Sequence, residues 1–169
     1  MTDRAEKSIP SPETTPAVLA VSPLPADRVL LREILDQGPW KLHEASTCRE
    51  ALDLLRDNKV SVLLSERDHA DGNWEELLNA TARLPTPPQL IVFSRLADES
   101  LWAEVLNMGG FDVLLTPFEA EEVLRVTFAA WSRWECDFGP APPTRKCVQQ
   151  AAGDGAANRL AGTVRISPA

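Results

Sequence analysis

The chain of 169 residues is long enough for one domain of ordinary size with additional segments, and its 44% apolar composition can fill one hydrophobic core. The formal net charge of -8 argues against a nucleic-acid surface, because affinity for a phosphate backbone comes mainly from clustered Lys and Arg. No stretch is apolar for long enough to cross a bilayer, and the N-terminus lacks the apolar segment of a signal peptide. We therefore expect a cytoplasmic protein that binds neither nucleic acid nor membrane.

The chain contains three cysteines, which are Cys48, Cys136 and Cys147. Their number is odd and no pair has CxxC spacing, so the sequence indicates neither a disulfide framework nor a zinc site. We expect reduced thiols without a functional role. We also expect that the protein holds no metal ion and no other cofactor.

Composition divides the chain into three parts. Residues 1–16 contain three prolines and scattered charges without periodicity, which predicts a disordered leader. Residues 17–135 form the predicted domain. Residues 136–169 hold Pro, Gly, Ala and Gln with few large apolar side chains, which predicts a flexible tail.

Five strand-helix units follow one another in the predicted domain. Apolar runs predict strands at residues 17–21, 40–45, 60–66, 87–94 and 111–117. Each run is followed by a helical pattern, and these patterns cover residues 25–37, 46–58, 74–84, 98–108 and 118–134. This spacing fits βαβ crossovers and a parallel sheet that helices cover on both faces.

Two of the predicted helices carry specific local signals. In the first helix, one apolar face is expected to be formed by Val29, Leu30, Ile34 and Leu35. In the second, Thr47 is the expected N-cap and Glu50, three residues later, completes a capping box.

Four motifs make the chain resemble the receiver domain of bacterial response regulators across residues 17–134. They are AVLAVSPLPADRVLLREIL, EASTCREALDLL, ERDHADGNWEELL and NMGGFDVLLTPF, in the order and spacing of that family. The resemblance implies an α/β fold of the flavodoxin and CheY-like (βα)5 type. Its doubly wound, five-stranded parallel sheet has the strand order 2-1-3-4-5.

The residues that perform phosphoryl transfer in that family are changed in this sequence. Two acids that follow the first strand and hold Mg²⁺ in the family correspond to Ser22 and Pro23, which offer no carboxylate. The acceptor aspartate corresponds to Glu66, whose extra methylene moves the carboxylate outward by about 1.5 Å. Misplacement by about 1 Å can cost on the order of a hundredfold in rate. The resemblance therefore implies a degenerate phosphoacceptor pocket.

The other side of this pocket is changed as well. The family lysine that pairs with the phosphate corresponds to Thr116, so the usual cation is missing. The hydroxyl residue after the fourth strand is kept as Ser94, and Pro117 is kept where the family often has a cis peptide bond. The aromatic switch residue corresponds to Val113, which cannot rotate between buried and exposed positions as Tyr does. We expect no catalytic residue and no enzyme.

The loop that follows the third strand contains further polar residues. Asp68 and Asp71 are interpreted as solvated turn formers beside Gly72, and His69 as a loop residue that packs on the surface. Two interpretations of Glu66 are considered. In the first, its negative charge imitates the phosphorylated state of the domain. In the second, Glu66 is what drift left after the phosphate site was lost, and it pairs with a neighbouring arginine, Arg67 or Arg95.

Large aromatic residues on the helices are candidates for a partner surface. We select Trp102 on the fourth helix and Trp131 and Trp134 on the last helix, because aromatic residues concentrate binding energy at interfaces. Trp131 and Trp134 are expected to be half exposed. Core filling is the simpler reading for each of them.

Three functional hypotheses follow. The first is a stand-alone, phosphorylation-independent receiver, with no output domain after Trp134, that acts in signal transduction by protein contact with a histidine kinase, another signalling protein or a second copy. The second is a genuine phosphoacceptor in a two-component phosphorelay that uses Glu66 or Asp68. The third is a pseudo-receiver that binds a small ligand through the hydroxyl groups of Ser22, Ser65, Ser94 and Thr116.

Overall fold

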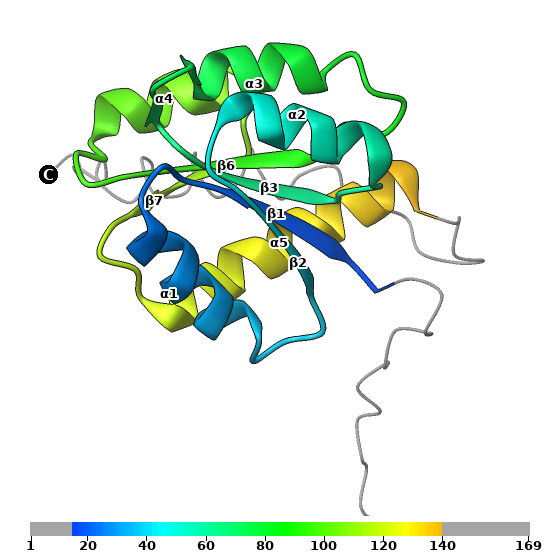
Figure 1. The fold of residues 1–169 in the computed structure, drawn as a ribbon, viewed down its shortest axis with the longest axis horizontal. Helices are drawn as coiled ribbons and strands as arrows, with labels where there is room; N and C mark the ends of the chain where they lie inside the picture. The colour runs from blue at the N-terminus through cyan, green and yellow to red at the C-terminus, as the bar shows by residue number, and fades with distance from the viewer. Residues whose placement is uncertain (1–14, 140–169) are drawn as a thin grey trace, which may run out of the picture. The chain divides into compact units, whose positions relative to one another are not determined.

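The computed structural model describes residues 15–139. In this part of the chain, five parallel strands form one sheet in the order β2-β1-β3-β6-β7 (Figure 1). Their bounds are β1 (Ala17–Val21), β2 (Lys41–Ala45), β3 (Val62–Glu66), β6 (Gln89–Ser94) and β7 (Asp112–Leu115). The predicted fold class and strand order are confirmed. Most of the predicted leader and tail lies outside the described residues.

Five helices cover the sheet on its two faces. Helices α1 and α5 lie on one face, and helices α2, α3 and α4 lie on the other (Figure 1). Their bounds are α1 (Pro25–Leu35), α2 (Cys48–Asp57), α3 (Trp74–Thr81), α4 (Glu99–Met108) and α5 (Ala120–Phe138). None of the described helices is long and apolar enough to span a bilayer.

The hydrophobic core consists of two clusters, one on each face of the sheet. Side chains alternate between faces along each strand, so β3 sends Leu63 to the cluster under α2, α3 and α4 and Leu64 to the cluster under α1 and α5. Both side chains are fully buried. Burial on both faces explains why the central strands read as continuous apolar runs rather than as alternating patterns.

The predicted apolar face of α1 is partly wrong. Val29 and Leu30 are 45% and 42% exposed, whereas the buried residues of α1 are Asp27, Leu31, Ile34 and Leu35. Residues 27, 31, 34 and 35 follow the spacing of one helical face, so the contact with the sheet is rotated away from the predicted face. The buried face therefore includes a carboxylic acid.

The predicted cap of α2 is confirmed, with one difference. The Thr47 hydroxyl accepts a hydrogen bond from the backbone N–H of Glu50 at 3.1 Å. The Glu50 carboxylate accepts hydrogen bonds from the backbone N–H and the hydroxyl of Ser46, at 2.8 and 2.9 Å, instead of returning to Thr47. Two unpaired N–H groups at the start of the helix are thus satisfied.

Two features of the described chain were not predicted. Helix α5 continues to Phe138, past the predicted end of the domain at residue 135, and an ion pair of 3.0 Å between Arg133 and Asp137 supports its last turn. A short antiparallel hairpin of β4 (Asp68–His69) and β5 (Gly72–Asn73) follows the end of β3. The predicted phosphoacceptor loop is therefore an ordered element.

Candidate functional site

The carboxyl ends of four neighbouring strands bring together the residues predicted for the degenerate pocket. Ser22 follows β1, Glu66 ends β3, Ser94 ends β6 and Thr116 follows β7. The backbone N–H of Thr116 still donates to the carbonyl of Ser94, at 3.1 Å, so the sheet pairing continues to this edge. In open α/β sheets this edge is the usual place for ligands. We refer to Ser22, Asp27, Glu66, Ser94 and Thr116 together as the carboxyl edge.

Ser22 is fully buried and is held by the first turn of α1. Its hydroxyl donates a hydrogen bond to Asp27 Oδ2 at 3.0 Å and accepts one from the backbone N–H of Leu24 at 3.2 Å. Its carbonyl accepts a hydrogen bond from the guanidinium of Arg28. The neighbouring Pro23 is exposed and offers no side-chain oxygen.

Asp27 was not predicted as a site residue, yet it is the most buried carboxylic acid at this edge. Its side chain is only 5% exposed. An acid in the first turn of a helix ordinarily faces solvent and complements the helix dipole, so the residue type alone does not predict that Asp27 is buried. The four-residue spacing from Asp27 to the buried Leu31 is the signal that places it on the inner face.

Glu66 lies half-buried beside Asp27. Burial and, to a smaller extent, the neighbouring Asp27 raise the pKa of the Glu66 carboxyl to about 7, whereas Arg95 acts in the opposite direction. Of the arginines proposed from the sequence, Arg67 pairs with Asp68 at 3.2 Å instead.

Three of the four hydroxyl groups proposed as ligand donors already have partners within the protein. Ser22 donates to Asp27, and Ser94 accepts from the backbone N–H of Leu96 at 3.1 Å. Ser65 donates to the carbonyl of Glu66 at 2.8 Å. Of these four hydroxyl groups, that of Thr116, which is buried, is the one without a hydrogen-bond partner among the described residues. Two surface hollows of about 350 and 400 Å³ lie beside α2 and are not lined by the carboxyl edge.

These residues do not fit a magnesium ion. Mg²⁺ requires octahedral oxygen ligands, usually with carboxylates among them, and the two positions after β1 carry a neutral hydroxyl and a proline. Within residues 15–139, no group of three or more His, Cys, Asp or Glu side chains is placed to hold a metal ion. The peptide bond between Thr116 and Pro117 is cis, as the resemblance implied.

Asp71 is exposed in the turn beside Gly72, as predicted, and it also has a structural role. Its carboxylate accepts hydrogen bonds from the backbone N–H groups of Cys48 and Arg49, each at 3.0 Å, and so ties the hairpin to the start of α2. These bonds lower the pKa of Asp71. Burial and the nearby Asp71 raise the pKa of the Cys48 thiol to about 12, which makes this thiol unreactive. Asp68 is likewise exposed, as predicted.

His69 packs on the surface, as predicted, although it belongs to the short strand β4 and not to a loop. The ring is half-buried, and its Nε2 forms a hydrogen bond of 2.9 Å with the Ser65 hydroxyl. Burial lowers the pKa of His69. The hairpin is therefore fixed at both ends, by His69 against β3 and by Asp71 against α2.

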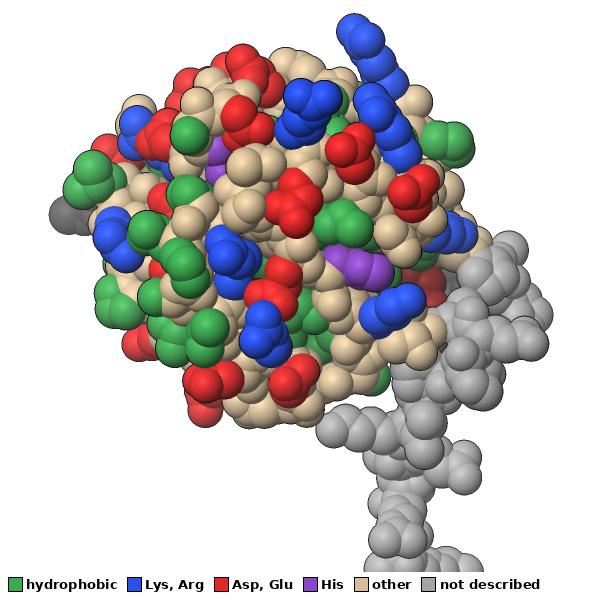
Figure 2. All heavy atoms as spheres, in the orientation of Figure 1, with side chains coloured by type: hydrophobic (Ala, Val, Ile, Leu, Met, Phe, Trp, Pro, Cys, Tyr) green, Lys and Arg blue, Asp and Glu red, His purple; other side chains and the backbone are tan. Residues whose placement is uncertain are grey.

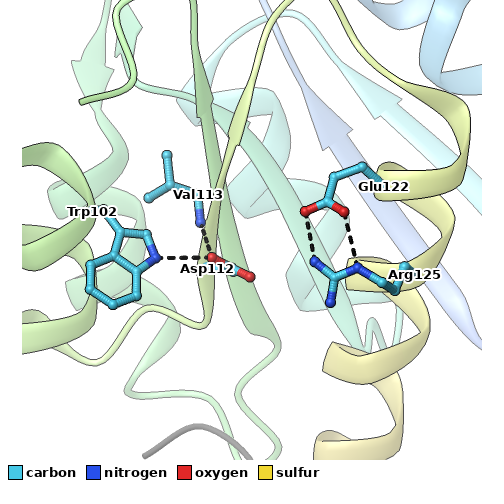
Figure 3. A network of polar contacts seen from close by, with 5 residues as sticks. All are labelled: Trp102, Asp112, Val113, Glu122 and Arg125. Atoms are coloured by element: carbon cyan, nitrogen blue, oxygen red, sulfur yellow. Dashed lines mark hydrogen bonds and ion pairs between the residues drawn. The ribbon is translucent and has the colours of Figure 1, made fainter. Parts of the chain in front are cut away.

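Trp102 belongs to a polar network on the face formed by α4, β7 and α5 (Figure 3). Its indole N–H donates to Asp112 Oδ1 at 3.2 Å, and the same oxygen accepts the backbone N–H of Val113 at 2.8 Å. On α5, Arg125 and Glu122 form an ion pair of 2.7 Å, and the pKa of Arg125 is raised by this pair and also by Asp112. Val113, the predicted switch position, is half-buried.

The prediction for the last helix holds for Trp131 and is wrong for Trp134. Trp134 is 8% exposed because it continues the buried stripe of α5 that runs through Val123, Val126, Thr127 and Ala130. The ammonium of Lys59 lies 5.0 Å from the centre of its ring. Trp131 is half-buried, and its ring lies 5.8 Å from that of Trp40 and 5.5 Å from that of Phe128. Phe128, which was not predicted, is 54% exposed.

No protein-family model matches the chain, and no curated protein matches its sequence. Solved structures do match. The receiver domain of an HD domain-containing protein from Pseudomonas fluorescens has a TM-score of 0.68 and 22% identity, over 77% of this chain and 96% of that one. The chemotaxis response regulator CheY4 of Vibrio cholerae has a TM-score of 0.62 and 20% identity, over 69% and 99%.

A third similar structure is the beryllofluoride-activated NtrC4 receiver domain dimer. It has a TM-score of 0.65 and 19% identity, over 70% of this chain and 98% of that one. All three structures are receiver domains or response regulators, and the match extends over nearly their full length. The resemblance found in the sequence is thus confirmed for the fold, and the chain has the fold of response-regulator receiver domains.

Proposed function

We propose that this protein is a receiver-like module that acts in signal transduction by protein contact, without accepting a phosphoryl group and without enzymatic activity. The observation that supports this most is the charge of the carboxyl edge. Asp27 and Glu66 bring two carboxyl groups together, and the positions where the resembling family has two further acids and a lysine carry Ser22, Pro23 and Thr116.

Phosphoryl transfer to a carboxylate is disfavoured at such an edge. The donor and the acceptor are both anionic, so the reaction depends on cations that neutralise the developing charge. Arg28 donates a hydrogen bond to the carbonyl of Ser22, and Thr116 supplies only a neutral hydroxyl. Arg95 attracts Glu66 but is exposed to solvent, where its charge is screened.

A protein partner fits the apolar side chains that the described surface exposes. Figure 2 shows hydrophobic side chains gathering over α1 and the segment between β7 and α5. Large apolar side chains that are exposed on α1, β7 and α5 are Val29, Leu30, Leu115 and Phe128. The partner would be a histidine kinase, another signalling protein or a second copy, and the NtrC4 receiver of similar fold is a dimer.

Intact mass spectrometry after incubation with acetyl phosphate and Mg²⁺ tests this proposal. We expect no phosphoryl adduct on the native chain, while a receiver known to accept phosphate, treated in parallel, gains one. A variant that combines Ser22→Asp, Pro23→Asp, Glu66→Asp and Thr116→Lys restores the family residues and should gain an adduct.

An adduct on the native chain would contradict the proposal. Its loss in Glu66→Gln or in Asp68→Asn would then identify the acceptor and make the protein a genuine member of a phosphorelay. Asp68 is exposed on the hairpin and paired with Arg67, so Asp68→Asn serves as the matched control for Glu66→Gln.

A further inference from the structure

We propose that the surface where α1 and α5 lie next to each other binds an amphipathic helix of a partner protein, one whose apolar stripe is bordered by lysine or arginine. The inference rests on the proposed function, because both take contact with another protein as the output of this module. It adds where the contact lies and which chemistry the partner presents. The site consists of five apolar side chains, which we call the apolar flank: Leu30, Trp40, Leu124, Phe128 and Trp131.

Helix α1 turns Leu30 towards α5. The two helices contact each other on one face of the sheet, where α1 lies on β1 and the edge strand β2, and α5 lies on β3 and β6. On the outer side of α1, Arg32 donates to Glu44 of β2 at 3.0 Å. Leu30 is rotated from Arg32 by about 200° around the helix, so it lies on the side of α5. Its side chain is 42% exposed and remains available for a contact.

The two exposed sides of α5 differ in their chemistry. The side towards β7 carries the ion pair of Glu122 with Arg125 at 2.7 Å, whose charges compensate each other (Figure 3). The side towards α1 carries Leu124, Phe128 and Trp131, with the spacing of one helical stripe. Apolar surface is therefore offered to a partner on the α1 side of the helix.

Aromatic contacts hold this surface in a fixed shape. Trp131 packs edge to face with Trp40 and with Phe128, at 5.8 and 5.5 Å between ring centres. Trp40 and Trp131 are half-buried against the core, whereas Phe128 is 54% exposed. A side chain that is already held by its neighbours loses little conformational freedom on binding, and aromatic side chains concentrate binding energy. Phe128 is therefore the expected anchor of the contact.

Acidic residues border the apolar flank. Glu33 follows Leu30 by three residues on α1, and Glu121 and Glu135 lie seven residues before and after Phe128 on α5. All three are exposed, and none forms an ion pair within residues 15–139. The arginines of the two helices all have acceptors within the protein, and they are Arg28, Arg32, Arg125 and Arg133. Cations on a partner would thus meet uncompensated negative charge.

Shape and charge together select the partner. Two neighbouring helices with an apolar strip between them offer a surface on which a third helix packs its own apolar stripe. A second copy of this chain would bring the same acidic border to the contact, and like charges that face each other weaken binding. The formal net charge of -8 adds to this repulsion. A basic amphipathic helix satisfies both the apolar and the charged part of the surface.

Fluorescence anisotropy with a labelled model peptide and the full chain tests the inference. The probe is an amphipathic helix with a leucine stripe bordered by lysines, and its matched control carries glutamates in place of the lysines. We expect the native chain to bind the lysine peptide and to bind the glutamate peptide far more weakly. Phe128→Ala should weaken binding of the lysine peptide by at least about tenfold. Leu30→Lys, which places a cation opposite the lysines, should weaken it as well.

Matched variants elsewhere separate this site from general attraction to an acidic protein. Leu96→Ala removes an apolar side chain that is 75% exposed but follows β6, and it should leave the dissociation constant unchanged. Replacing Glu121 and Glu135 by Gln should weaken binding and reduce its dependence on salt, whereas Glu104→Gln on α4 should do neither. Circular dichroism checks that each variant is folded.

The inference is overturned if the lysine peptide does not bind, if the two peptides bind equally, or if Phe128→Ala binds as the native chain does. A native chain that sediments as a dimer, together with a monomeric Phe128→Ala, would also overturn it, because the surface would then belong to a second copy. None of these results changes the mass spectrum expected with acetyl phosphate. Failure of this inference and failure of the proposed function are therefore distinguishable.

Discussion

Two regions of the described structure use opposite means to hold their residues in place. The carboxyl edge buries polar groups, among them the Asp27 carboxyl and the Thr116 hydroxyl, which has no hydrogen-bond partner among the described residues. The aromatic end, which we define as Trp40, Phe128, Trp131 and Trp134, is held by its rings: Trp131 packs edge to face with Trp40 and with Phe128, and Trp134 is buried. Charge and protonation determine the energetics of the first region, and apolar burial determines those of the second.

The difference shows how a fold can be retained while its chemistry changes. Packing at the aromatic end depends on shape and apolar area, so it remains intact when polar residues elsewhere are replaced. At the carboxyl edge, replacing a few residues alters the charge and with it the reaction that is possible. The following predictions test this contrast, and the first concerns the aromatic end.

Replacing Trp134 by Ala should have the largest effect on stability. The ring is only 8% exposed and lies against the ammonium of Lys59, so its removal leaves a cavity and should lower the free energy of unfolding by about 3 kcal/mol. Urea denaturation followed by circular dichroism measures the change. Phe128→Ala is the matched control, since Phe128 lies on the same helix but is exposed, and it should cost less than about 1 kcal/mol. Equal effects of the two variants would refute the burial argument.

Replacing Asp71 by Ala should have an intermediate effect near the carboxyl edge. The variant removes the acceptor of two backbone N–H groups at the start of α2 and should cost about 1 kcal/mol, as loss of a helix cap does. Asp68→Ala, on the exposed strand of the same hairpin, should cost almost nothing.

The pH dependence of the Asp71 effect provides a second measurement. Because the pKa of Asp71 is lowered in the folded state, its contribution is present above pH 3.8 and is lost as the pH falls below that value. Urea denaturation of the native chain and of Asp71→Ala should therefore give midpoints that converge in strong acid. A difference that persists unchanged there would show that Asp71 acts through something other than its charge.

The smallest predicted effect concerns the protonation of His69. Burial lowers the pKa of His69, so its neutral form stabilises the fold above pH 6.5, and this contribution is lost as the pH falls further. The loss should stay below about 1 kcal/mol, because solvent screens a half-buried ring. Thermal unfolding of His69→Gln should show a weaker loss of stability in acid than the native chain. The same loss in both would contradict this assignment.

Much of the fold could be predicted from the sequence, because its signals are local. Strand-helix alternation and the Thr47 cap each depend on residues a few positions apart. The hairpin after β3 was missed, since two-residue strands are too short to produce a period. The exposed side of α1 was misjudged because Val29 and Leu30 are apolar without being buried.

The sequence by itself determined the order of the elements, the fold that this order produces, and the residue types that stand at the strand ends. Only the tertiary structure decided which of those residues meet. The contacts of Asp27 with Glu66 and of Asp71 with α2 join residues far apart in the chain, and they depend on sheet pairing and helix rotation. The burial of Trp134 has the same origin. A local pattern specifies which elements form, but it does not specify their mutual orientation to within the length of a hydrogen bond.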